Sequence, residues 1–131
     1  MQTVVACLLA ATFMPMMCAW IASYHRYQQF DGKVDNKMPR IQSSKLEGVG
    51  HRAYAAQQNC WEALAVFSAA LLALHMSSVV LASVATLCTV FVLLRAAYIV
   101  CYLTNQDIFR SLFFIGGFGI NVYLFYLALT L

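Results

Sequence analysis

Charged residues are scarce in this sequence: only 10% of its 131 residues carry a formal charge, whereas 63% are hydrophobic. A soluble domain usually carries about 25% charged residues, so this chain lacks the groups that cover a water-exposed surface. A membrane-spanning helix, in contrast, needs about 20 predominantly apolar residues. The composition therefore excludes an ordinary soluble domain. It predicts an all-α integral membrane protein that forms one domain over residues 1–131.

Motifs for metals and nucleotides are also missing. The five cysteines are scattered through apolar segments without the CxxC or Cys/His spacing of a metal site, so we expect small buried residues and no metal. The glycines at 116, 117 and 119 lie in an apolar segment, where they favour close helix packing over phosphate binding. Basic and aromatic residues do not interleave, so we expect no nucleic acid partner.

Four apolar stretches predict four spans, which should pack as a four-helix bundle in contact with membrane lipid: 3–24, 53–74, 79–103 and 111–131. Pro15 lies inside the first span, where it should kink or break the helix. The long loop at about 25–52 holds most of the lysine and arginine residues. By the positive-inside rule, this loop and the one between the third and fourth spans should face the cytoplasm.

Several polar side chains lie inside the predicted spans, where they must face protein or water. They form two helical stripes, one on the second span and one on the third: Arg52, Asn59 and Glu62, and Arg95, Tyr98 and Tyr102. A charge at the bilayer centre costs at least about 2.5–3.5 kcal/mol on insertion scales. Glu62 and Arg95 should therefore find partners or line a polar cavity. The alternative is a structural Glu62–Arg95 pair that only fixes helix packing.

The same residues carry a resemblance to a known family. The run RAYAAQQNCWEALAVFSAALLAL, at 52–74, resembles the second-helix signature of the MAPEG family, the membrane-associated proteins of eicosanoid and glutathione metabolism. The Arg-Ala-Ala-Tyr segment at 95–98, together with Tyr102, resembles the third helix of that family. Arg110 and Ser111 resemble the start of its fourth helix. The resemblance covers essentially the whole chain.

The resemblance implies a homotrimer whose active sites lie between subunits and open toward the cytoplasm, where glutathione meets a lipophilic substrate. It implies that Arg110 lies near the glutathione sulfur and that Ser111 helps to activate the thiol. It also implies a set of glutathione-binding residues: Arg26, Arg52, Asn59, Glu62, Arg95, Tyr98 and Tyr102. The reaction would be that of a transferase or peroxidase acting on lipophilic electrophiles or lipid hydroperoxides.

Departures from the family pattern leave a second function open. Members with strong glutathione chemistry usually carry Arg-Ala-His ahead of the asparagine, where this chain has Ala-Ala-Gln-Gln at 55–58. Phe114 replaces a tyrosine of some members. Because fewer cations weaken glutathione binding, the alternative is a non-catalytic membrane protein that binds lipid. A proton pathway on Glu62 and Arg95 is disfavoured, since one acid and one base form no relay. The short loops favour a bacterial inner membrane over the endoplasmic reticulum.

Overall fold

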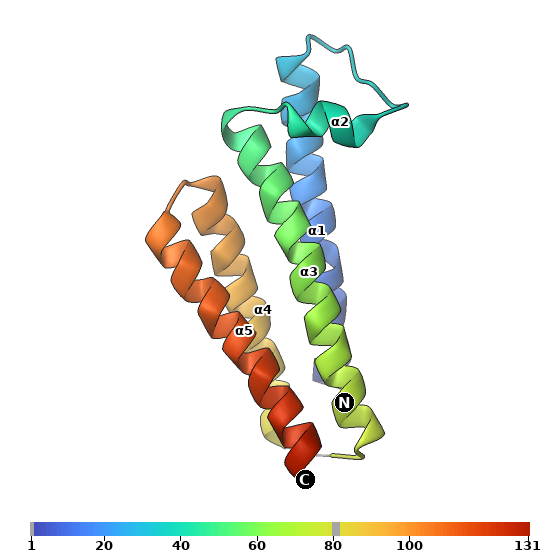
Figure 1. The fold of residues 1–131 in the computed structure, drawn as a ribbon, viewed down its shortest axis with the longest axis vertical. Helices are drawn as coiled ribbons and strands as arrows, with labels where there is room; N and C mark the ends of the chain where they lie inside the picture. The colour runs from blue at the N-terminus through green and yellow to red at the C-terminus, as the bar shows by residue number, and fades with distance from the viewer. Residues whose placement is uncertain (1, 80–81) are drawn as a thin grey trace.

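The computed structural model describes residues 2–79 and 82–131 (Figure 1). These residues form α-helices in the order α1 (Gln2–Gln29), α2 (Pro39–Ser44), α3 (Gly48–Met76), α4 (Ala82–Leu103) and α5 (Asp107–Thr130). All but α2 are long and apolar enough to cross a membrane. The all-α fold predicted from composition is confirmed, and the chain is a multi-pass integral membrane protein.

The four long helices form two antiparallel pairs, in which α3 packs along α1 and α5 packs along α4 (Figure 1). The connection that contains α2 and the turn at 104–106 lie toward one end of the bundle, the loop end. Both chain ends lie at the other, the terminal end. Figure 1 also shows that the two pairs converge at the terminal end and diverge toward the loop end.

The helices extend beyond the apolar stretches that predicted the spans. α1 continues to Gln29 and α3 begins at Gly48, so the predicted loop at 25–52 is helical at both ends and also contains α2. The predicted loop therefore includes helical residues, because hydropathy marks only the part of a helix that fits the hydrocarbon layer. α5 likewise begins at Asp107 rather than at 111. Residues 80–81 of the predicted third span lie outside the described residues.

Two single residues affect how α1 is placed. Pro15 is buried and does not break α1, which is continuous on both sides of it. Of the two expected outcomes, a kink or a break, the break does not occur, in keeping with the tolerance of proline in packed membrane helices. Gly50 allows α3 to approach α1 at the loop end, since a Cβ there would lie 2.8 Å from the Cβ of His25. Gly50, in the first turn of α3, thus permits the close packing of this pair at the loop end.

The interior contains two main clusters of different character. At the terminal end, an apolar cluster includes Phe67 and Phe91, whose rings stack with centroids 4.1 Å apart. Toward the loop end, a smaller cluster contains two cysteines, Cys18 and Cys60, and the ring of Tyr98. Four of the five cysteines are buried as expected, and Cys101 is half-buried.

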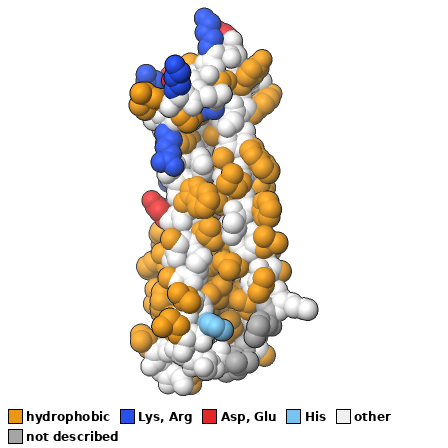
Figure 2. Space-filling view, turned by 90° about the vertical axis from the view of Figure 1, so that its right-hand side faces the viewer, with side chains coloured by type: hydrophobic (Ala, Val, Ile, Leu, Met, Phe, Trp, Pro, Cys, Tyr) orange, Lys and Arg blue, Asp and Glu red, His pale blue; other side chains and the backbone are white. Residues whose placement is uncertain are grey.

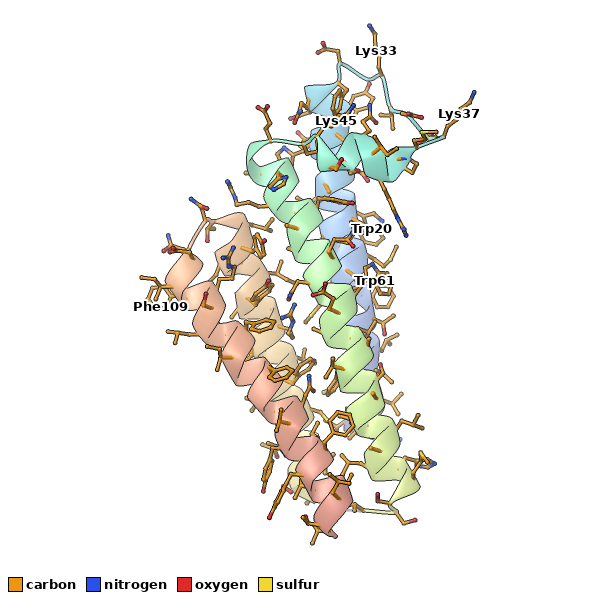
Figure 3. All side chains as sticks on the ribbon, viewed as in Figure 1. Trp20, Lys33, Lys37, Lys45, Trp61 and Phe109 are labelled. Atoms are coloured by element: carbon orange, nitrogen blue, oxygen red, sulfur yellow. The ribbon has the colours of Figure 1, made fainter. Side chains whose placement is uncertain are left out.

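The outer surface matches a membrane environment. Hydrophobic side chains cover the long helices in Figure 2, while lysine and arginine gather at the loop end. Lys33, Lys37 and Lys45 extend from the connection around α2 (Figure 3). The charge is therefore segregated along the long axis of the molecule.

Candidate functional site

Arg95 is buried in the middle of the bundle, with 3% of its surface exposed. Its Nη2 donates hydrogen bonds to Asn59 Oδ1 at 2.8 Å and to Cys60 Sγ at 3.6 Å. Its guanidinium carbon lies 4.2 Å from the centroid of the Tyr98 ring. This distance allows a cation–π interaction, which favours the charged form of arginine in an apolar setting.

Glu62 reaches Arg95 through Asn59. The amide Nδ2 of Asn59 donates a long hydrogen bond of 3.5 Å to Glu62 Oε2, while its Oδ1 accepts from Arg95. Glu62 is exposed on the outer side of α3. The alternative of a direct Glu62–Arg95 pair was therefore wrong. The asparagine lies between the two charges and connects α3 to α4.

Arg110 lies at the loop end of α4 and α5. Its guanidinium carbon lies 4.5 Å from the centroid of the Tyr102 ring. The Tyr102 ring also meets the Tyr98 ring edge to face, with centroids 5.6 Å apart. With Ser111 and Phe114, these side chains line an open cavity of about 310 Å³. A half-buried cation therefore borders a space that a small molecule can enter.

Ser111 points its hydroxyl group at its own helix. Its Oγ donates a hydrogen bond to the carbonyl oxygen of Asp107 at 3.0 Å. The backbone N–H of Arg110 is also used, since it donates to the carbonyl of Gln106 at 3.0 Å. In this arrangement the guanidinium, and not the helix start, is the available positive group at the cavity.

Arg52 interacts with the end of α4. Its Nε donates a hydrogen bond of 3.1 Å to the carbonyl oxygen of Leu103, the last residue of α4. The last carbonyls of a helix lack intrahelical partners and carry partial negative charge, so a cation there is favourable. Arg52 therefore joins the two helix pairs at the end where they diverge.

Arg26 lies on a different side of the molecule from Arg110. Its Nη1 donates to the carbonyl of Pro39 at 3.2 Å, while its buried Nε has no hydrogen-bond partner among the described residues. It borders an open cavity of about 640 Å³ between α1, α2 and α3, lined also by Arg40, Gln57 and Gln58. These three residues were not predicted from the sequence as candidates. Gln57 and Gln58 were considered only as a departure from the family pattern, although two adjacent glutamines in a predicted span were a signal that could have indicated this cavity.

A third cavity, of about 120 Å³, lies between α3, α4 and α5. It brings Asn59, Glu62 and Arg95 together with Asn121, a residue that sequence reasoning missed. Asn121 is 2% exposed, and its Oδ1 has no hydrogen-bond partner in the described part of the chain. A lone asparagine in an apolar stretch was the available signal, since polar groups within the membrane are expensive.

A comparison with protein families identifies the family of this chain. The model of the MAPEG family matches residues 3–130, nearly the whole chain. The chain belongs to the MAPEG family. Neither a curated protein nor a solved structure gave a match. MAPEG proteins generally use glutathione, so membership fits a glutathione-related transferase or peroxidase at a membrane.

Within this MAPEG chain, the predicted site residues do not all line one cavity. Two neighbouring cavities that share Phe114 are lined by Asn59, Glu62, Arg95, Tyr98, Tyr102, Arg110 and Ser111. Arg52 contacts the end of α4 instead. Arg26 belongs instead to the cavity between α1, α2 and α3. The chain therefore carries two separate polar surfaces, and the predicted residues do not form one closed site within it.

Proposed function

We propose that this MAPEG protein binds glutathione, stabilises its thiolate, and uses it on lipophilic electrophiles or lipid hydroperoxides. The observation that carries the proposal is the position of Arg110. Its guanidinium is held over the Tyr102 ring at an open cavity, next to the exposed Ser111. A cation held in place beside an accessible space is suited to a sulfur anion.

The electrostatic energy available is sufficient for this role. A thiol with a pKa of about 8.5 is only a few per cent thiolate at neutral pH, and lowering that pKa by two units requires roughly 2.7 kcal/mol. A unit charge pair at about 4 Å and an effective dielectric near 20 contributes about 4 kcal/mol before desolvation is deducted. Arg110 alone could supply the difference. Ser111 would turn its hydroxyl from the Asp107 carbonyl to donate to the sulfur.

The remaining candidates would hold the rest of glutathione. Glu62 is suited to the α-amino group, and Asn59 to the peptide backbone. Tyr98, Tyr102 and the buried Arg95 would line the adjoining wall. Arg52 would act mainly on the end of α4, because its Nε already donates to the Leu103 carbonyl.

A homotrimer would unite the two polar surfaces. The Arg26 cavity is bounded by α1, α2 and α3, whereas the Arg110 cavity is bounded by α4 and α5. A neighbouring subunit that places its Arg26 surface against the Arg110 surface would surround glutathione with cations from both. We expect a trimer by light scattering in mild detergent, and a stable monomer that still binds glutathione would contradict this arrangement.

The charge distribution supports a site that opens to the cytoplasm. Lys33, Lys37 and Lys45 lie at the loop end (Figure 3), the end toward which Arg110 also lies. Positive residues favour the cytoplasmic side. We therefore place the loop end in the cytoplasm and propose a bacterial inner membrane.

Ultraviolet absorbance of the thiolate tests the proposed function directly. Glutathione added to the purified protein at neutral pH should produce a saturable thiolate band, and S-methylglutathione, which has no ionisable thiol, should produce none. If glutathione binds without a thiolate band, the thiolate mechanism is wrong.

A lipid-binding protein without catalysis is the second candidate. Two observations favour it: residues 55–58 carry no cation, and the Ser111 hydroxyl is directed to its own helix. Absence of glutathione binding, together with retention of a lipid through purification, would support this alternative.

A further inference from the structure

The cavity between α3, α4 and α5 has a polar floor deep in the bundle. Three buried side chains from two helices form this floor: Phe91 and Arg95 of α4, and Asn121 of α5. Gly117 leaves space above them, because a Cβ at this position would lie 3.8 Å from Arg95 Cδ and from the Phe91 ring. The cavity is therefore a gap in the packing at which two polar side chains meet.

Both polar groups of the floor have unused hydrogen-bonding capacity. Asn121 Oδ1 is buried and accepts no hydrogen bond from the described residues. The two hydrogen bonds of the Arg95 side chain both come from Nη2, so the donors on Nε and Nη1 remain available. A buried polar group without a partner costs about 1–3 kcal/mol, so such groups call for an explanation. A ligand that both donates and accepts would satisfy them.

The walls and the opening indicate a lipophilic molecule. The walls are formed by Ala63 and Val66 of α3 and by Phe114 and Phe118 of α5. Both phenylalanines are exposed on the outer surface of the bundle. The cavity thus opens between α3 and α5 on the outer surface of the bundle, where the exposed side chains are apolar, and apolar atoms reach it more readily than a fully hydrated molecule does.

The negative charge of Glu62 at the opening of the cavity disfavours an acidic ligand. Glu62 lines the same cavity and is exposed at its edge, so its carboxylate would repel an incoming anion. A neutral hydroxyl group avoids this repulsion and offers one donor and two acceptor positions. Its O–H would donate a hydrogen bond to Asn121 Oδ1, and its oxygen would accept one from Nε or Nη1 of Arg95.

We propose that this cavity binds the hydroxyl group of a single-chain lipophilic molecule that enters from the bilayer, with Asn121 as acceptor and Arg95 as donor. The site is separate from the proposed thiolate position. Asn121 lies about three turns further along α5 than Arg110, roughly 16 Å at 1.5 Å per residue. The cavity shares Asn59, Glu62 and Arg95 with the proposed glutathione contacts. The test is therefore performed without glutathione, so that its failure can be told apart from a failure of the thiolate proposal.

Competition for a photoreactive long-chain alcohol tests the proposal. The whole protein in nanodiscs is labelled with the probe in the presence of 1-dodecanol or of dodecyl methyl ether, and the labelled residues are identified by mass spectrometry. Dodecanol should compete about tenfold better than the ether, which accepts but cannot donate a hydrogen bond. The label should lie on α3 and α5 at the residues that line this cavity.

Three variants separate this site from general lipid contact. Asn121→Leu should abolish the preference for the alcohol, since the acceptor is lost. Gly117→Ala should fold normally, because the added Cβ makes only ordinary contacts, yet it should weaken the binding of both compounds severalfold by filling the cavity. Gly119→Ala is the matched control on the same helix, since nothing lies within 4 Å of a Cβ there. It should leave both affinities unchanged.

Other outcomes would overturn the proposal. Equal competition by alcohol and ether would show that no hydrogen bond selects the ligand, and a preference that survives Asn121→Leu would place the hydrogen bond elsewhere. A label on other surfaces, or no saturable labelling at all, would mean that water or a neighbouring subunit fills the cavity.

Discussion

The terminal half and the loop half of the bundle are filled in different ways. In the terminal half, the buried residues are almost entirely apolar and include the stacked Phe67 and Phe91. Toward the loop end, the buried residues include the charged Arg95, and cavities open on both sides of the bundle. One half has the packing of a structural core, whereas the other keeps space beside charged groups.

This difference shows how a short membrane chain can be both stable and functional. Close packing gives a well-defined arrangement of helices, and at the terminal end it leaves little room for a ligand beyond the cavity that reaches Phe91. The polar half depends on the apolar half to hold its helices in place. Substitutions in the polar half should therefore affect mainly the chemistry, and substitutions in the apolar half should affect mainly the stability.

The largest effect is expected from Arg110→Ala in the polar half. Because the guanidinium is proposed to hold the sulfur as thiolate, turnover of a chloronitrobenzene with glutathione should fall by about tenfold to a thousandfold. Glutathione affinity should change less, since other groups hold the peptide. Steady-state kinetics and the thiolate band measure the two effects separately.

Arg110→Lys is the matched variant for this prediction. A lysine keeps the positive charge and loses the planar guanidinium, so part of the activity should return. If the wild type is active and Arg110→Ala is equally active, the sulfur lies elsewhere, and Arg95 or Tyr102 becomes the group to test.

Leu74→Ala should show the opposite behaviour in the apolar half. Leu74 is buried in the cluster at the terminal end. Its truncation should leave a cavity and lower the free energy of unfolding by about 2 kcal/mol, measured by denaturant unfolding in detergent. The kcat of the folded fraction should stay unchanged. A loss of activity at unchanged stability would contradict the division into two halves.

The smallest effect is expected from Glu62→Ala. Glu62 is exposed, and it contacts Asn59 through a long hydrogen bond of 3.5 Å, so its carboxylate is held less firmly than that of a buried, closely paired residue. We expect glutathione affinity to fall only about threefold to fivefold in a calorimetric titration. Glu62→Gln tests the role of charge, because it retains the contact with Asn59. Equal binding by wild type and both variants would leave Glu62 with a purely structural role.

The sequence was most informative where physical constraints were strong. The apolar stretches of the four spans predicted the long helices because the bilayer demands continuous apolar helices of that length. The positions of Arg95, Tyr98 and Tyr102 on one side of α4 followed from helical periodicity. The combination of Asn59 and Glu62 with Arg95 was also sufficient to indicate the MAPEG family, whose model matches the chain.

Side-chain partners could not be predicted in the same way. Periodicity places Glu62 and Arg95 on facing helices, but it cannot show that Asn59 lies between them. Arg52 was predicted as a ligand-binding residue, but its Nε donates a hydrogen bond to the carbonyl at the end of α4. The position of that helix end depends on how the helices pack, which the local sequence does not show. Asn121 was missed because an isolated polar residue forms no pattern. These features depend on how the helices meet, and that information is not local in the chain.

The composition of α3 also has a consequence for how the protein is made. The polar residues that give α3 its role, such as Asn59 and Glu62, also make it the least apolar of the four spans. Such a segment gains least from entering the bilayer alone. Because α3 packs along α1, the two helices would best enter the membrane as a hairpin, with the contacts of α1 offsetting the weak insertion of α3. Buried α1 residues such as Ala11 and Ala22 would then stabilise the hairpin during biosynthesis, before any ligand is bound.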